Sequence, residues 1–246
     1  MTSQGRHTGY SSDGMKELAA DDPRASEPLY TIEEAALFLG MKRSTLVDWL
    51  QGRSRSRPLV HVVEDQGRSF IPFIGFAEAA VSSVLRRGLS GQYIRRALAR
   101  LQDELGKEYA LASEDLYLHG SKILYDYLGL DGTKKLVEVT SGNAVFRPIV
   151  QEGLRRIDYA DGYATSLILP KTRWDVVSVD PRWGSGQPLT IAGGARLVDL
   201  LRRFGAGEDP MAVADDYRVP REDMLEIIRV FYRAPEGPQP ELPTAA

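Results

Sequence analysis

The chain has 246 residues, of which 43% are hydrophobic and 9% aromatic, a composition typical of folded domains rather than of disordered chains. This length predicts one to three small domains. The formal net charge is −3, and the absence of cysteine excludes disulfides, thiolate metal sites and cysteine nucleophiles. The first residues lack the apolar segment of a signal peptide, and no apolar run approaches the ~20 residues that span a bilayer. We therefore expect a soluble, cytoplasmic protein.

Both ends of the chain have the composition of unstructured segments. Residues 1–28 are polar and rich in Ser, Gly and Asp, so we expect a flexible lead-in. Residues 235–246 form an acidic, proline-rich tail that is not expected to fold.

A first helix followed by a tight turn is predicted directly after the lead-in. Thr31 and Glu34 form a T-x-x-E capping box ahead of an apolar run. Ile32, Ala35 and Leu39 then share one helical face. Gly40 stands where this helix must end, because glycine accepts the left-handed backbone of a tight turn.

A second helix is predicted immediately after this turn. Ser44 or Thr45 is expected to cap it. Leu46, Trp49 and Leu50 return at helical spacing and are expected to pack against the first helix.

The next segment predicts a β-hairpin, or wing. Residues 59–64 and 69–73 have the pattern of two short strands, with Asp65-Gln66-Gly67 as the turn and Arg68 at the tip. A further helix is predicted over residues 76–87, with Gly88 after it.

These elements together have the layout of a winged helix-turn-helix, which reads DNA with its second helix. Exposed residues of that helix are expected to meet bases and nearby phosphates; they are Arg43, Ser44, Thr45 and Gln51. The basic residues around them are expected to anchor to phosphate; they are Lys42, Arg53, Arg55, Arg57 and Arg68. Residues 42–107 contain twelve Lys or Arg and six Asp or Glu, although the whole chain is acidic. This basic island favours DNA binding over a small trihelical unit that merely packs within some other domain.

The pattern changes from helix to strand along the middle of the chain. Ile94, Leu98, Leu101 and Leu105 predict a helix whose apolar stripe covers either its own domain's core, which is favoured, or a dimer partner. Strands are predicted at residues 122–127, 135–139, 154–159 and 163–169, with Asp161-Gly162 as a hairpin turn between the last two. The first domain is therefore expected over residues 29–107, and a small central antiparallel β module over residues 108–172.

Residues 173–234 predict a turn-rich loop and a bundle of three short helices. The helices are expected at residues 195–204, at residues 211–217 and after Pro220. From Gly205 to the C-terminus, nine acidic residues face four basic ones, which favours a protein-binding or dimerising unit over a second DNA-reading surface. The predicted fold class is α+β, mainly α.

Nothing in the sequence indicates catalytic residues, a cofactor or a metal site. His7, His61 and His119 lack metal-ligand spacing to one another or to Asp and Glu. Gly184-Ser185-Gly186 and Gly193-Gly194 are not followed by the Gly-Lys-Ser/Thr of a phosphate loop, so we interpret them as loop glycines. An enzyme is therefore the last of the alternatives.

Two stretches resemble known families. YTIEEAALFLGMKRSTLVDWL, with its wing and following helix, resembles the MerR-type winged helix-turn-helix. VSVDPRWGSGQPLTIAGGARLVDLL, followed by MAVADDYRVPREDMLEII, resembles the trihelical domain of VapB-like antitoxins. The residues that carry the second resemblance are Asp180, Pro181, Gly186 and Pro188 in the loop, Gly194, Ala195 and Arg196 at the first helix start, and Ala214, Asp215, Tyr217, Glu222 and Asp223 in the later helices. Ala195 stands where that family often has threonine.

Over most of residues 29–234, the chain is similar to the longer VapB-like antitoxins of actinobacteria. The resemblance implies a type II antitoxin that represses its own operon and neutralises a PIN-like ribonuclease toxin. The acidic C-terminal unit would then cover a basic groove on the toxin. Palindromic promoter sites need two DNA-reading heads, so a homodimer is expected. The alternatives are a MerR-type regulator that senses a small molecule and an adaptor that oligomerises on DNA.

Overall fold

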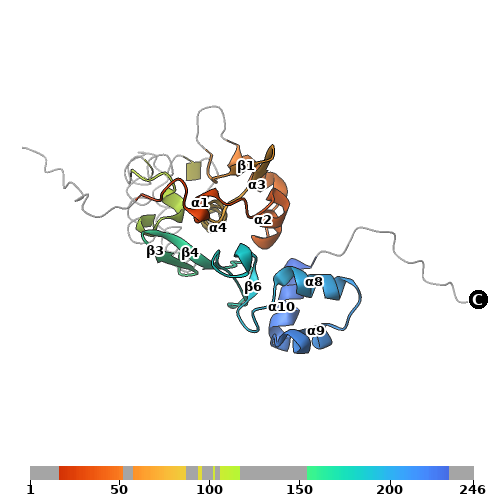
Figure 1. The fold of residues 1–246 in the computed structure, drawn as a ribbon. Helices are drawn as coiled ribbons and strands as arrows, with labels where there is room; N and C mark the ends of the chain where they lie inside the picture. The colour runs from red at the N-terminus through yellow and green to blue at the C-terminus, as the bar shows by residue number, and fades with distance from the viewer. Residues whose placement is uncertain are drawn as a thin grey trace, which may run out of the picture.

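The computed structural model describes residues 17–51, 58–86, 94–95, 102, 106–116 and 154–232. The fold is α+β, as predicted. Helices α1–α4 and the hairpin β1–β2, within residues 23–85, lie at one end of the molecule, and helices α8–α10, within residues 197–231, lie at the other (Figure 1). Strands β3–β6, within residues 157–190, lie along the first group and reach towards the second.

The predicted first helix is α2 (Ile32–Phe38), and its capping box is confirmed. The Thr31 hydroxyl accepts a hydrogen bond from the Glu34 amide at 3.2 Å, and the Glu34 carboxylate accepts one from the Thr31 amide at 2.9 Å. Gly40 has a φ of 58°, and the Met41 amide donates to the carbonyl of residue 36 at 2.9 Å. This is one of the two hydrogen bonds of a Schellman motif, which ends the helix and turns the chain.

The predicted second helix is α3 (Arg43–Leu50), but its cap differs from the prediction. Neither Ser44 nor Thr45 caps it, because the helix begins two or three residues earlier than expected, directly after the glycine turn. Lys42 occupies the N-cap position and makes no side-chain capping bond. Ser44 and Thr45 therefore lie within the first turn of the helix.

The predicted wing is confirmed as the hairpin of β1 (Val63–Asp65) and β2 (Arg68–Phe70). Its turn residues Gln66 and Gly67 both have positive φ, 48° and 75°, as a two-residue hairpin loop requires. The strands are shorter than predicted, because the next residue, Ile71, pairs with Tyr30 instead. That pairing joins the chain ahead of α2 to the base of the wing.

The helix after the wing, α4 (Phe73–Leu85), begins three residues earlier than predicted, with Pro72 as its N-cap. It is buried on nearly every side, which suits a helix that is hydrophobic all round. The short helices α1 (Pro23–Ser26) and η1 (Ala110–Ala112) and strand β4 pack against it.

Helix α1 corrects the prediction that all of residues 1–28 form a flexible lead-in. The Asp22 carboxylate caps this helix by accepting from the Arg24 amide at 2.9 Å, and Pro23 stands at its first position. Ala25 is buried beside α4. The apolar surface of α4 thus orders a segment whose own composition is polar.

A four-stranded antiparallel sheet follows, with its strands in sequence order. The strands are β3 (Ile157–Ala160), β4 (Tyr163–Ile168), β5 (Val177–Val179) and β6 (Leu189–Thr190). The Asp161-Gly162 hairpin is confirmed, with φ values of 53° and 80°. The sheet crosses position 172, where the sequence suggested a boundary between units. The strands predicted at 122–127 and 135–139 lie outside the described residues, and so does most of the helix predicted after residue 90.

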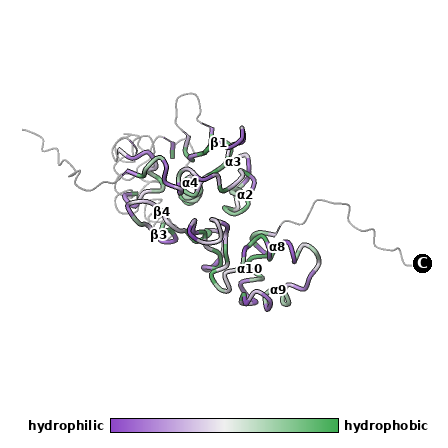
Figure 2. Tube along the Cα trace, viewed as in Figure 1, coloured by the Kyte–Doolittle hydropathy of each residue, from purple (hydrophilic) through white to green (hydrophobic). Residues whose placement is uncertain are grey.

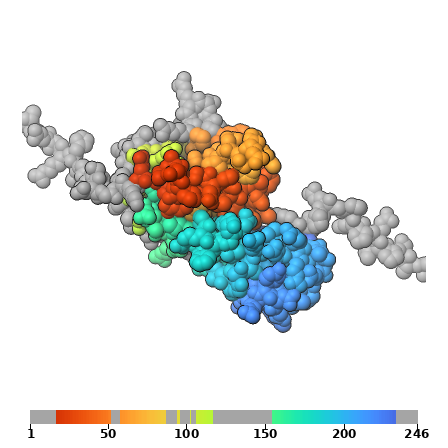
Figure 3. All heavy atoms as spheres, in the orientation of Figure 1, coloured from red at the N-terminus to blue at the C-terminus, as the bar shows by residue number. Residues whose placement is uncertain are grey.

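Three helices complete the described chain: α8 (Leu197–Gly205), α9 (Pro210–Tyr217) and α10 (Arg221–Phe231). They confirm the predicted C-terminal bundle, which we call the C-terminal lobe. Hydrophobic and hydrophilic stretches alternate along these helices (Figure 2), and Leu200, Val213 and Ile227 are among the residues of their common core. The lobe forms a rounded mass at one end of the molecule (Figure 3). Among the described residues, no helix is both long and apolar enough to cross a bilayer.

Candidate nucleic-acid interface

Helix α3 presents one face to the core and the opposite face to solvent. Leu46 and Trp49 are buried, whereas Ser44, Asp48 and Gln51 are exposed. Thr45 is half-buried and lies on the flank between these two faces. The structure therefore leaves open the face that the sequence assigned to base contacts.

Two cations gather on the wing side of α3, around the carboxylate of Glu33. The Arg43 guanidinium lies 2.5 Å from this carboxylate, and both side chains are more than half exposed. The hydrogen bond from Arg43 lowers the pKa of Glu33, and the nearby charge of Arg68 lowers it further. Arg68, at the start of β2, lies 5.9 Å from the ring centroid of Phe70. An ion pair this exposed contributes little to stability, so a phosphate or a base edge can take the place of Glu33.

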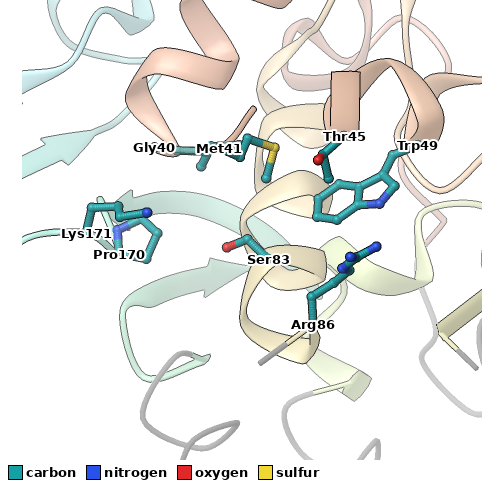
Figure 4. A pocket seen from close by; sticks show the side chains of 9 residues that line it. Gly40, Met41, Thr45, Trp49, Ser83, Arg86, Pro170 and Lys171 are labelled. Carbon is teal, nitrogen blue, oxygen red and sulfur yellow. The ribbon is translucent and has the colours of Figure 1, made fainter. Parts of the chain in front are cut away.

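A depression of about 330 Å³ lies on the other flank of α3 (Figure 4). Its wall is built from α3, from the turn before it, from the end of α4 and from the connection between β4 and β5. The polar and charged residues among its lining are Thr45, Ser83, Arg86 and Lys171. We call this depression the flank pocket.

Lys171 closes the flank pocket over the turn of the helix-turn-helix. A Cβ placed on Gly40 would lie 2.6 Å from Cγ and Cε of Lys171, so the lysine stem packs directly on the glycine. Among the described residues, neither Lys171 nor Arg86 forms an ion pair with a carboxylate. Sequence reasoning missed Lys171, because it follows β4, far along the chain, and no local pattern connects it with the turn.

The residues after Lys171 attach the same connection to the C-terminal lobe. The Arg173 amide donates to the Glu226 carboxylate at 2.7 Å, and the Trp174 indole N–H donates to Asp223 at 2.7 Å. Arg229 also pairs with Glu226 and holds the pKa of that carboxyl well below its usual range. Residues 170–174, the connecting segment, therefore contact the turn before α3 at one end and α10 at the other.

Some of the predicted site residues are not placed by the structure. Arg53, Arg55 and Arg57 lie outside the described residues. Lys42 is exposed at the N-cap of α3. Arg95, which sequence reasoning did not select, donates to the backbone carbonyl of Asp48 and so supports α3 from outside the helix-turn-helix.

A second depression, of about 350 Å³, lies beside α4 and contains Glu78. This carboxyl group is buried and accepts a hydrogen bond from the His61 amide at 2.7 Å, and burial raises its pKa to about 8. The His61 ring packs edge-on against Tyr109, with centroids 5.0 Å apart. Within the part of the chain that the structure describes, no group of three or more His, Asp or Glu could hold a metal ion.

Comparison with known proteins agrees with this architecture. Residues 28–98 match a family model described as "Putative DNA-binding HTH domain". Over 226 residues, the chain is 34% identical to the "Putative antitoxin VapB45" of Mycobacterium tuberculosis, a match that covers 83% of this chain and 94% of that protein. The crystal structure of Rv2018 from Mycobacterium tuberculosis superposes with a TM-score of 0.69 at 32% identity, covering 83% of this chain and 99% of that one. The resemblance to VapB-like antitoxins is thus confirmed, and the chain belongs to the family of the antitoxin VapB45.

Proposed function

We propose that the protein is the antitoxin of a type II toxin–antitoxin pair. It represses its own operon through the N-terminal helix-turn-helix, and it neutralises a PIN-like ribonuclease toxin through the C-terminal lobe. The observation that carries this proposal is the open outer face of α3, flanked by cations, in a member of an antitoxin family.

In this proposal, α3 lies in the major groove of the operator. Arg43, Ser44, Thr45 and Gln51 contact bases or nearby phosphates from this helix. Phosphate contacts come from the surrounding cations, which are Lys42, Arg53, Arg55, Arg57 and Arg68. Two copies bind a palindromic operator as a homodimer, because one head of this size covers only a half-site.

The C-terminal lobe offers a surface suited to a basic protein partner. Residues 197–232 contain eight acidic residues and five arginines. On α10, Glu222 is exposed and has no ion-pair partner among the described residues. Leu225 is 56% exposed on the same helix, and Trp174, bonded to Asp223, is 41% exposed. An apolar anchor, Leu225, beside the exposed carboxylate of Glu222 fits a partner whose active groove is built to bind RNA.

DNA binding is tested with the full chain against its own upstream region and against scrambled DNA of equal composition, over a series of salt concentrations. We expect selective binding to the upstream region with a steep salt dependence. Arg43→Ala should reduce the free-energy preference for the upstream region over scrambled DNA by roughly 1–3 kcal/mol if Arg43 makes a bidentate base contact. Arg202→Gln is the matched control, since Arg202 is an exposed arginine in α8, at the other end of the molecule. Weak binding that is equal for both DNAs would refute the regulator and favour an adaptor that uses DNA as a scaffold.

Toxin binding is tested with the purified product of the neighbouring gene, which this proposal requires to be a small nuclease. Leu225→Arg should abolish capture of that protein and leave DNA binding intact, whereas Arg202→Gln should change neither. A point variant is preferable to deletion from residue 173, because that deletion removes β5 and β6 and leaves β4 with an open edge. If the folded Leu225→Arg protein still captures the toxin, α10 is not the binding face.

A further inference from the structure

We propose that the flank pocket beside α3 is a phosphate site, and that its occupant is a backbone phosphate of the DNA that α3 reads. This inference rests on the proposed DNA binding and extends it. It assigns a phosphate contact to Lys171, a residue outside the helix-turn-helix, and another to Arg86 at the end of α4.

The position of the pocket on α3 supports this occupant. Thr45 follows Arg43 by two residues, which is about 200° around an α-helix, so the two side chains lie on nearly opposite flanks. Arg43 and the wing residue Arg68 therefore mark one flank, and the pocket marks the other. A helix with its side chains is about 10–12 Å across, close to the width of the major groove, about 12 Å. Both flanks of a helix in that groove then approach the phosphate strands on either side.

The chemistry of the lining matches a phosphodiester. Lys171 and Arg86 supply two positive charges, and the hydroxyls of Thr45 and Ser83 supply neutral donors. Figure 4 shows the Lys171 amino group and the Ser83 hydroxyl turned towards the same space, with Arg86 extending towards Trp49. Because the described residues provide no carboxylate partner for either cation, both charges are available to an anion.

The cation from outside the helix-turn-helix is held in place before DNA arrives. The stem of Lys171 lies on Gly40, where any side chain would collide with it. Two and three residues later, the connecting segment is fixed to α10 through Arg173 and Trp174. The contact with Gly40 and the hydrogen bonds at Arg173 and Trp174 reduce the entropy that Lys171 would lose on binding a phosphate.

The test measures how the DNA affinity of the full chain depends on salt. Lys171→Met keeps the stem over Gly40 and removes only the charge. Arg86→Gln removes the charge of the second cation. Each should lower the salt slope by about one and weaken binding to the upstream and scrambled DNAs by the same factor. Lys171→Arg should keep the slope, and the remote Arg202→Gln should leave it unchanged.

The outcomes separate this inference from the function on which it rests. If the wild-type protein selects its upstream DNA but the protein carrying both Lys171→Met and Arg86→Gln keeps the wild-type salt slope, the phosphate site is refuted and the regulator stands. If the wild-type protein shows no selective DNA binding, both are refuted. Equal unfolding midpoints for Lys171→Met and Lys171→Arg establish that a changed slope reflects charge rather than folding.

A second arm distinguishes a DNA phosphate from a free phosphorylated ligand. Pyrophosphate is titrated into the full-length wild-type protein and into Lys171→Met, and binding is followed by isothermal titration calorimetry. We expect no saturable signal, because an isolated anion lacks the other contacts that DNA makes. A saturable signal that Lys171→Met abolishes, with unchanged DNA slopes, would overturn the DNA assignment in favour of a small phosphorylated ligand.

Discussion

Replacing the buried Glu78 with glutamine should change how the stability of the protein depends on pH. Glu78 lies in α4 with 4% of its surface exposed, and its carboxyl group accepts a hydrogen bond from the His61 amide. Burial raises its pKa to about 8, and the charge of Glu108 adds to the effect. Glutamine has nearly the same shape and keeps an oxygen that can accept from His61, but it cannot ionise.

The magnitude follows from the two pKa values. In the unfolded chain this carboxyl loses its proton near pH 4.5, whereas in the folded protein it keeps the proton up to about pH 8. The stability contributed by the bound proton is therefore complete below pH 4.5 and is lost as the pH rises through 8. At about 1.4 kcal/mol for each pH unit, Glu78 should cost the wild-type protein roughly 3 kcal/mol between pH 5 and pH 8.

The measurement is urea unfolding of the wild-type protein and Glu78→Gln at pH 5, 6, 7 and 8. The stability of the variant relative to the wild type should rise by roughly 3 kcal/mol across this range, whatever the other groups contribute. Glu27→Gln, at an exposed glutamate, is the matched control for the removal of one carboxylate from the surface. Parallel stability curves for Glu78→Gln and the wild type would refute the argument, because they would mean that Glu78 is ionised in the folded protein at pH 5.

Three further substitutions test local features of the fold and of the interface. Thr31→Ala removes the capping box of α2 and should lower the free energy of unfolding by about 1 kcal/mol in urea titrations. Gly193→Ala places a Cβ 2.3 Å from the Tyr217 carbonyl and should lower the thermal midpoint far more than Gly207→Ala, where the φ is also positive but the space is open. Glu33→Gln releases Arg43 and should tighten DNA binding by a few-fold, because the free energy of an exposed ion pair corresponds to a factor of about that size. Glu222→Gln, which removes a carboxylate in α10, is the control and should leave DNA binding unchanged.

The sequence predicts best those features that depend on a few adjacent residues. The T-x-x-E box, the glycine turn before α3 and the Asp161-Gly162 hairpin all appear where they were expected. Each depends on a local preference of the backbone or of a short side chain, so it can be predicted without knowing the distant contacts of the fold. The helix predicted after Pro220 also appears, as α10, because helical periodicity is a property of the segment itself.

Features that depend on distant contacts could not be predicted from the sequence. The polar segment at residues 23–26 is helical because α4 covers it, and Ile71 leaves the wing because Tyr30 pairs with it. The β5 and β6 strands join a sheet that begins before the suggested boundary at residue 172. On the candidate interface, the exposed face of α3 was foreseen, but Glu33, Arg86 and Lys171 were not. Their roles arise from which elements the fold brings beside α3.

The connecting segment of residues 170–174 also has a thermodynamic consequence. It contacts Gly40 through Lys171 and α10 through Arg173 and Trp174, so it is common to the two proposed binding surfaces. If a partner on α10 displaces this segment and changes the affinity for DNA by some factor, DNA must change the affinity for that partner by the same factor. Through these five residues, toxin binding would then weaken or strengthen operator binding, and operator binding would change toxin binding by the same factor.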